Sequence, residues 1–335
     1  MEIQMNSTCK SFSTYSCLAC GGKDFDVLFS APNFDSGEKS FRLTRCKSCH
    51  LVRTEPISFD SELEQFYNLP YYGDGKKKFI GFAEALTYFF NYTRACSILS
   101  KIKDARKCLK NYAHIILDIG CGRGTLLRVL KRMGCECYGV ERAQFPSDGP
   151  GRDIHFYSRN LEDISFAESF FDAVVIWHVL EHTDNPISMI QETARVLRPG
   201  GVLVIAVPNF GSFQAKIFRE SWFHLDLPRH RFHFTPDTLL RFLSKNGFTI
   251  TRRHTFSIEQ NPFGFIQSFF NKIMPFGEPN RFYSLLKNMH GISSALNFFL
   301  WTVLTILVFP FALLEYLISG LLGKGATFIV YAKKC

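Results

Sequence analysis

Three glycines at alternate positions, Gly120, Gly122 and Gly124, follow an apolar run that ends in Asp118. Glycine lets the backbone turn sharply and brings bare peptide groups close to a ligand. A helix predicted directly after Gly124 would point its first N–H groups at that ligand. The dinucleotide fingerprint places its third glycine three residues after the second, whereas here the step is two. The spacing therefore argues against a pyrophosphate cofactor.

A second acidic residue, Glu141, follows a short predicted strand over 135–140. An acid about twenty residues beyond such a glycine turn is placed to accept hydrogen bonds from a ribose diol. A third predicted strand, 154–157, leads into Asn160 and Leu161. These residues all follow strands whose carboxyl ends would meet at one edge of a sheet, so we expect a nucleoside to bind there.

Further strands and helices continue the alternation. A strand predicted over 171–177 precedes a helix that is capped near Asn185 and has Pro186 in its first turn. A fifth strand follows over 202–207, and a later helix begins at Thr235. This order favours an open α/β sheet, in which ligands bind outside the carboxyl ends of the strands.

In order and spacing, these segments resemble the class I S-adenosylmethionine-dependent methyltransferases over residues 113–255. The resemblance implies a Rossmann-like, seven-stranded methyltransferase sheet that binds S-adenosyl-L-methionine. Where this family usually has Asp in the adenine loop, the chain has Asn160, which still accepts a hydrogen bond. Tyrosines before the core either cover the cofactor, as in related enzymes, or pack a linker. The implied cofactor-binding residues are Asp118, Gly120, Cys121, Gly122, Glu141, Asn160, Leu161, His178 and Tyr72.

Two C-x-x-C pairs, Cys17 with Cys20 and Cys46 with Cys49, stand near the N-terminus. Four thiolates from two such knuckles bind one tetrahedral zinc ion. The first ten residues lack the pattern of a signal peptide, so we expect reduced thiols or metal ligands rather than disulfides. A redox C-x-x-C is the alternative, but no βαβ unit surrounds either pair. Bacterial small-molecule methyltransferases carry a similar zinc ribbon.

The ribbon sequence mixes acidic residues with few basic ones, so it has no electrostatic footprint for phosphate. We therefore expect no nucleic-acid partner. The net charge of +9 over the whole chain would favour an anionic surface or a phosphorylated substrate. A structural role for the ribbon beside the substrate cleft is the preferred interpretation, because a module this small needs a metal to stay folded.

Histidines follow the fourth and fifth strands, on the side where a methyl acceptor would bind. A hydroxyl acceptor needs a general base, and His182, His230 and His233 are the catalytic candidates. A purely structural role for each of them is the alternative. His178, Glu181 and His182 also match the H-x-x-E-H zinc-protease motif. That motif requires a regular helix, whereas this pentapeptide is predicted to leave the end of a strand.

An apolar segment over 295–322 contains one charged residue, Glu315, and is long enough to cross a bilayer. Residues 325–334 are predicted to form the last strand of the sheet, so both ends of the segment would lie on one side. Pro310 in the middle then favours a helix–Pro–helix hairpin that enters one leaflet. The alternative is a lid buried against the domain or a partner chain. We expect a cytoplasmic protein associated with the cytoplasmic face of a membrane.

The predicted organisation is a zinc ribbon over 1–60, a helical linker and cofactor cover over 61–112, a methyltransferase core over 113–260 and 325–335, and an apolar helical insert over 261–324. The fold class is α/β, with the ribbon in front and the insert before the last strand. The predicted activity is in-line methyl transfer to a small or lipid-linked acceptor. An RNA or protein methyltransferase, or a non-catalytic membrane-associated module with this fold, remains the alternative.

Overall fold

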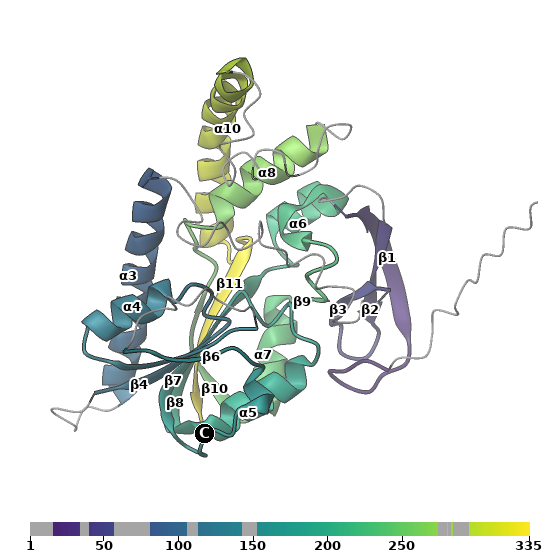
Figure 1. The fold of residues 1–335 in the computed structure, drawn as a ribbon. Helices are drawn as coiled ribbons and strands as arrows, with labels where there is room; N and C mark the ends of the chain where they lie inside the picture. The colour runs from purple at the N-terminus through teal and green to yellow at the C-terminus, as the bar shows by residue number, and fades with distance from the viewer. Residues whose placement is uncertain are drawn as a thin grey trace, which may run out of the picture.

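The computed structural model contains a seven-stranded sheet and a separate four-stranded sheet (Figure 1). Helices flank the larger sheet, and two more helices extend away from it. The structure describes residues 16–33, 40–56, 81–105, 113–142, 153–273, 280, 283 and 295–335, without the side chains of 81–84, 103–105 and 295–300. Tyr72, predicted to cover the cofactor, lies outside the described residues.

The larger sheet is the α/β sheet that the sequence predicts. In spatial order its strands are β10 (Phe248–His254), β11 (Thr327–Lys334), β8 (Leu197–Pro208), β7 (Phe171–Trp177), β4 (Ile115–Ile119), β5 (Glu136–Val140) and β6 (His155–Tyr157). Only β11 runs against the others, pairing antiparallel with both β10 and β8. The last strand of the chain therefore lies inside the sheet, which confirms its predicted place beside the fifth and sixth strands.

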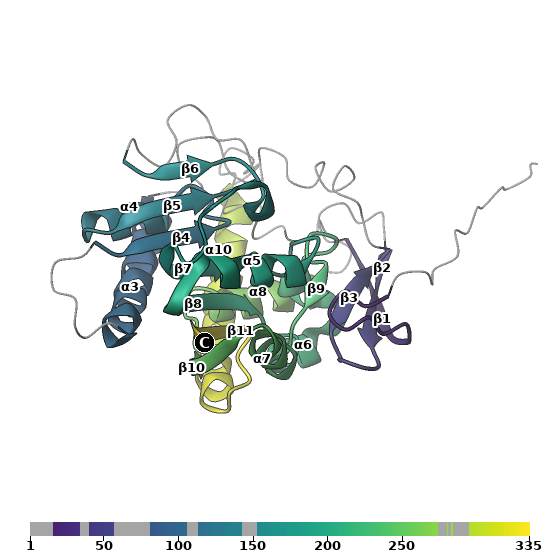
Figure 2. The same ribbon diagram turned by 90° about the horizontal axis from the view of Figure 1, so that it is seen from below.

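Strand side chains alternate between two apolar layers. In β7, Ala173 and Val175 face one layer, whereas Val174 and Ile176 face the other. The first layer packs against α3 (Gly81–Ala105) and α4 (Thr125–Arg132), and the second packs against α5 (Pro186–Val196) and α7 (Pro236–Lys245). Figure 2 shows these helices around the sheet. Burial on both faces explains why the strands read as nearly continuous apolar runs.

The predicted helix starts are confirmed at the two capped helices. The Asn185 side chain accepts hydrogen bonds from the backbone N–H groups of Ile187 and Ser188, both at 3.1 Å, at the start of α5. Thr235 and Thr238 form a reciprocal capping box at the start of α7. Such caps stabilise a helix by about 1 kcal/mol each.

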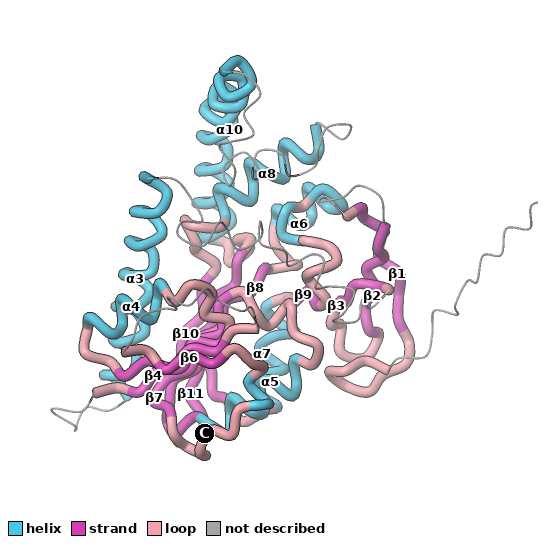
Figure 3. The backbone as a smooth tube through the Cα atoms, viewed as in Figure 1, coloured by secondary structure: helices cyan, strands magenta, loops and turns pink. Residues whose placement is uncertain are grey.

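The smaller sheet joins the N-terminal module to the core. Its strands are β1 (Phe25–Pro32), β2 (Ser40–Cys46), β3 (Val52–Glu55) and β9 (Phe232–His233). Strand β9 comes from the segment that follows β8, and it pairs antiparallel with β3. Figure 3 shows the two sheets as separate groups of strands connected through loops. Backbone hydrogen bonds therefore attach the module to the side of the core where the acceptor is expected.

Short helices connect β8 to β9, and the chain later reaches α8 (Asn261–Ile273) after α7 and β10. They are α6 (Phe213–Phe218), η3 (Arg219–Ser221) and η4 (Phe223–Leu225), while η2 (Leu161–Asp163) follows β6. Trp222 and Phe218 are buried between the smaller sheet and α8. This packing makes the segment after β8 a bridge between the N-terminal module and the apolar insert.

The apolar insert forms one long helix, α10 (Ala295–Leu321), which packs against α8. The predicted helix–Pro–helix hairpin is wrong, because α10 continues through Pro310. Proline removes one backbone hydrogen bond, but Val308 and Ala312, on either side of it, are both buried against α8. That packing holds the two halves in line. Helix α8 lies obliquely against α10, and both extend away from the larger sheet (Figure 1).

Among the described residues, α10 contains one stretch that is long and apolar enough to cross a membrane. It covers Trp301–Leu321, with a mean hydropathy of 2.0 and only 22% of its residues buried. Its one charged side chain, Glu315, turns inward and accepts a hydrogen bond from Gln214 at 2.7 Å. The outward faces therefore carry apolar residues without an acidic or basic side chain.

Candidate active site

The glycine turn at the end of β4 is held between two neighbouring strands. Gly120, Gly122 and Gly124 all have positive φ angles, of 68°, 51° and 67°. The Gly120 N–H donates to the Val140 carbonyl at 2.7 Å. A Cβ on Gly120 would lie 2.2 Å from the Val179 side chain, so no other residue fits there without rearrangement. The turn thus closes tightly at the carboxyl end of the sheet.

A crevice of about 290 Å³ opens beside this turn. This is near the low end of the volumes of ligand sites, roughly 300–1,000 Å³. Of the residues predicted to bind the cofactor or act in catalysis, those that line it are Gly120, Glu141, Asn160, Leu161 and His182. They come from the ends of β4, β5, β6 and β7, which is the edge that the sequence predicts for a ligand.

Glu141 stands at the rim with both carboxylate oxygens engaged by the backbone. Oε2 accepts from the Gly122 N–H at 3.0 Å, and Oε1 accepts from the Arg142 N–H at 2.8 Å. The Arg142 guanidinium donates to Asn160 Oδ1 at 2.6 Å and to Asp184 at 2.8 Å. These contacts fix Glu141 to the glycine turn. Through Arg142 they also connect Asn160 to Asp184, and all three residues line the crevice.

Asp118 is buried beneath the turn and does not line the crevice. Burial raises the pKa of its carboxyl to about 7, the Arg94 guanidinium opposes that rise, and Glu141 adds to it. Arg94, on α3, lies 3.6 Å above the Trp177 ring and pairs with Glu259 at 2.7 Å. The buried Asp118 carboxyl thus lies near a guanidinium that is already paired with Glu259.

Arg94 was not predicted from the sequence as a site residue. It lies in the middle of α3, about three turns before the helix ends at Ala105, and no motif surrounds it. Only its place in the fold brings it to Asp118. Trp177, the last residue of β7, was predicted as part of the strand but not as a partner for a cation.

Cys121 and Gly122, also predicted to bind the cofactor, do not line the crevice. The Cys121 sulfur packs beneath the turn, where a Cβ on Gly139 would come within 2.8 Å of it. His178 has a φ of 54° at the end of β7, and its Nδ1 lies 3.2 Å from Glu181 Oε1. These residues support the turn and the adjacent loop.

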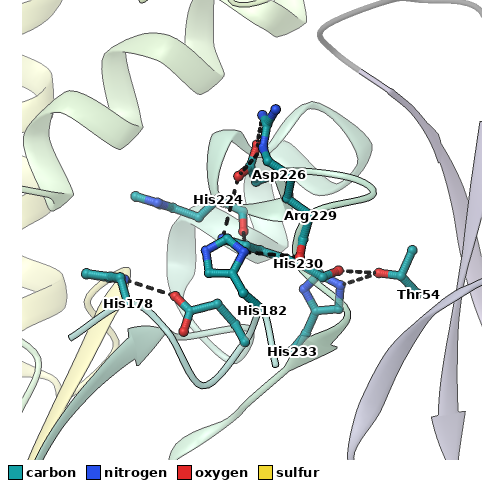
Figure 4. Close-up of polar contacts among 9 residues, drawn as sticks. Thr54, His178, His182, His224, Asp226, Arg229, His230 and His233 are labelled. Carbon is teal, nitrogen blue, oxygen red and sulfur yellow. Dashed lines mark hydrogen bonds and ion pairs between the residues drawn. The ribbon is translucent and has the colours of Figure 1, made fainter. Parts of the chain in front are cut away.

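The three candidate bases lie near one another but differ in surroundings (Figure 4). The rings of His182 and His230 stand 4.5 Å apart, centroid to centroid. His233 instead lies against the N-terminal module, with its Nε2 3.0 Å from the Thr54 hydroxyl. Burial lowers the pKa of His182 to about 4 and that of His233 to about 3. Of the three, only His182 borders the crevice.

The segment 178–182 is a turn between β7 and α5 rather than a helix. The geometry of the zinc proteases, with two histidines on one helical face, is therefore absent from these residues. The rejection of that motif is confirmed, because the strand ends at Trp177 and α5 begins only at Pro186.

The four N-terminal cysteines come together as a compact cluster. Their sulfur atoms all lie within 4.8 Å of one another, with Cys17 3.5 Å from Cys49 and Cys20 3.5 Å from Cys46. A Cβ on Gly22 would come within 3.2 Å of the Cys46 sulfur and 3.3 Å of the Cys20 sulfur, so a larger residue there would crowd the cluster. Hydrogen bonding to Cys17 and then burial raise the pKa of Cys49. Four cysteine sulfurs in this arrangement could hold one metal ion.

Residues 90–253 match a protein family described as a methyltransferase domain. The ubiquinone biosynthesis O-methyltransferase of Maricaulis maris (strain MCS10) is 32% identical over 161 residues, or 44% of this chain and 63% of that protein. The same-named protein of Nitrobacter winogradskyi (strain ATCC 25391) is 27% identical over 183 residues, or 51% of this chain and 68% of that protein. The chain thus spans less than two thirds of the Maricaulis relative.

Two solved structures have a similar chain path. A putative sarcosine dimethylglycine methyltransferase from Galdieria sulphuraria has a TM-score of 0.49 at 16% identity, covering 82% of this chain and 98% of its own. A SAM dependent methyltransferase from Archaeoglobus fulgidus has a TM-score of 0.46 at 20% identity, and the match covers 74% of this chain and 94% of that one. Neither likeness is close enough to carry a functional assignment.

Proposed function

Because residues 90–253 match a methyltransferase domain, we propose that the protein is a class I S-adenosylmethionine-dependent methyltransferase that acts on a small or lipid-linked acceptor. The observation that carries the proposal is the crevice beside the glycine turn, with Glu141 fixed at its rim. In open α/β sheets this edge is where nucleoside ligands bind. An RNA or protein acceptor is the less favoured alternative, since the ribbon is not basic.

The residues present fit S-adenosylmethionine. The close contact between Gly120 and Val179 leaves the turn as bare backbone, and the two Glu141 oxygens suit a ribose diol. Asn160 and Leu161 border the part of the crevice that would take the adenine. Asp118 and Arg94 would serve the amino-acid end, because their opposite charges complement an ammonium and a carboxylate.

The bound cofactor would supply an activated methyl group on a sulfonium. An acceptor lone pair forms the new bond to the methyl carbon, the carbon–sulfur bond breaks, and the sulfur keeps that electron pair. A hydroxyl acceptor also releases its proton. The protein has to align the acceptor, exclude water and receive this proton. His182 borders the crevice next to Glu181 and His230, so this cluster is assigned to the acceptor side.

The acceptor class follows from the relatives and from α10. Two curated relatives are O-methyltransferases of ubiquinone biosynthesis, which supports a hydroxyl on a small or lipid-linked molecule for this chain too. The apolar faces of α10 would lie against a lipid bilayer, on its cytoplasmic face. Ile306 and Phe311 are each 65% exposed, and the only charged residue in the helix turns inward. A bilayer would cover a surface of this length better than a single small partner.

The four-cysteine cluster is assigned to zinc as a structural staple. Its sulfurs lie within the span of one tetrahedral ion, and the apolar side chains of β2 and β3 pack against residues of the segment after β8. Zinc would hold the module in shape, and β3 would hold β9 in place. The metal has no part in the chemistry under this assignment.

Isothermal titration calorimetry with S-adenosylhomocysteine tests the cofactor site. We expect binding by the full chain and at least a tenfold loss in Glu141→Gln, whereas the exposed Glu136→Gln should bind as the wild type does. Absence of binding by folded wild-type protein would contradict the activity.

Flotation with anionic liposomes tests the assignment of α10. The wild type should float, and Ile306→Asp with Phe311→Asp should stay in the soluble fraction. A matched control, Val27→Asp at a position on β1 that is 61% exposed, should leave flotation unchanged while the protein stays folded. Wild-type protein that remains soluble as a dimer would instead assign the exposed face to a second copy of the chain.

A further inference from the structure

Three side chains on the acceptor side form a group whose geometry suits a metal ion. One ligand atom each from Glu181, His182 and His230 lies within 4.8 Å of the others. Two separate segments supply them, the turn after β7 and the loop before β9. The Glu181 carbonyl accepts hydrogen bonds from the N–H groups of Arg231 at 2.8 Å and Phe232 at 3.2 Å. Backbone contacts therefore hold the two segments in register.

Both histidine rings have a defined orientation. His182 Nδ1 lies 3.1 Å from the Arg229 carbonyl, and His230 Nδ1 lies 2.9 Å from the His224 carbonyl (Figure 4). A carbonyl can only accept, so each Nδ1 carries the hydrogen, which leaves Nε2 as the ring atom that could bind a metal. His230 Nε2 lies 3.7 Å from Asp226 Oδ2 and would exchange this contact for one with the ion. Metal-binding histidines in proteins are fixed in this way by a backbone carbonyl.

Glu181 gives the second, independent observation. Its side chain is 1% exposed, and its Oε2 has no hydrogen-bond partner among the described residues. Its other carboxylate oxygen, Oε1, lies 3.2 Å from His178 Nδ1. A buried carboxylate oxygen without a partner is costly, and a cation at that oxygen would remove the cost.

We propose that Glu181 Oε2, His182 Nε2 and His230 Nε2 bind a divalent transition-metal ion such as Zn²⁺. Two imidazoles and one carboxylate are a donor set of catalytic metal sites, which keep at least one position open. Magnesium and calcium prefer oxygen ligands only, so this set selects against them. The site differs from the H-x-x-E-H motif, because His178 contacts Glu181 and the second imidazole comes from His230.

The open coordination position of this metal ion would bind the methyl acceptor, a role that rests on the proposed methyltransferase function. Because His182 also lines the crevice, an acceptor oxygen could reach the ion from the cofactor side. A metal-bound hydroxyl has a lowered pKa and loses its proton more readily, which makes it a better nucleophile. The released proton would pass to solvent water, so neither His182 nor His230 would act as a general base.

Metal binding by the full chain tests this site separately from the cysteine cluster. Protein stripped of metal and refilled with one equivalent of zinc, which the four thiolates take first, is dialysed against Co²⁺. We expect about one Co²⁺ per chain, bound at least tenfold more weakly by Glu181→Gln and by His230→Gln. Glu220→Gln, a change of the same type at an exposed glutamate, should bind cobalt as the wild type does.

X-ray absorption at the cobalt edge of the wild type keeps the test independent of how the variants fold. Imidazole scattering without sulfur ligands is expected. Absence of the additional cobalt, sulfur ligation, or equal affinity in Glu181→Gln would each overturn the site. Calorimetry with S-adenosylhomocysteine on the same samples separates the two proposals. Cofactor binding without cobalt refutes only the metal site, and cobalt binding without cofactor refutes only the methyltransferase activity.

Discussion

Replacing Asp118 by Asn tests how the buried carboxyl beneath the glycine turn affects stability. Burial raises its pKa in the folded protein from 3.8 to about 7. The folded state therefore holds the proton more tightly than the unfolded chain does. The stabilising contribution of the protonated carboxyl is complete below pH 3.8 and is lost as the pH rises through 7. Three pKa units correspond to about 4 kcal/mol, an upper limit for this loss.

Asparagine imitates the protonated carboxyl at every pH. The free energy of unfolding of Asp118→Asn, minus that of the wild type, should thus rise by roughly 1.4 kcal/mol per pH unit between pH 5 and 6.5. Above about pH 7.5 the difference should be constant. Urea unfolding followed by circular dichroism at each pH measures it. Asp24→Asn, at an exposed aspartate, is the matched control and should give a difference that does not vary with pH.

Asp118→Asn should also lose affinity for the cofactor. The ionised Asp118 carboxylate would accept a charge-assisted hydrogen bond from the cofactor's ammonium group, and asparagine carries no charge to replace it. The expected loss is roughly 10- to 100-fold above pH 7, measured by calorimetry with S-adenosylhomocysteine. The protein would then be more stable and bind less well. A stability difference that is flat from pH 5 to pH 8 would refute the reasoning about burial. Unchanged affinity would refute the assignment of Asp118 to the amino-acid end.

Three other changes probe the turn and the N-terminal module. Gly122→Ala should cost about 1–2 kcal/mol of unfolding free energy from its positive φ, since a Cβ there meets nothing within 4 Å. Gly120→Ala should cost more, because of its contact with Val179; equal losses in urea unfolding would contradict the difference. Cys46→Ser should abolish binding of the structural zinc, as elemental analysis would show; zinc that stays bound would exclude this cluster. Thr54→Val removes two hydrogen bonds to the acceptor-side loop and should destabilise it by about 1–2 kcal/mol; unchanged exchange of the loop amides would argue against the contact.

Local signals in the sequence predicted most of the sheet. The fourth strand was predicted over 171–177, as found, and the predicted start of the helix at 125 agrees with α4. A buried strand has a continuous apolar run, and capped helices begin at recognisable side chains, so both can be read from neighbouring residues. The last strand was also predicted correctly, because its apolar run stands apart from the insert.

The parts that were missed depend on contacts between distant residues. Strand β9 has only two residues, and it forms because β3, about 180 residues earlier, pairs with it. Arg94 is a site residue only because the fold places it over Trp177 and near Asp118. The helical sequence around Arg94 contains no pattern that predicts these neighbours. The error at Pro310 has the same origin, since packing on α8 outweighs the local preference of proline.

The contacts around β9 link the cysteine cluster to the candidate metal site through a short series of hydrogen bonds. Thr54, in β3, donates its hydroxyl hydrogen to the His230 carbonyl at 2.6 Å, and its N–H donates to the Arg231 carbonyl at 2.9 Å. The N–H of Arg231 in turn donates to the Glu181 carbonyl. A shift of β3 would therefore displace His230 relative to Glu181. The crevice depends instead on the ends of β4, β5 and β7, so loss of the structural zinc should disturb the acceptor side while the cofactor site persists.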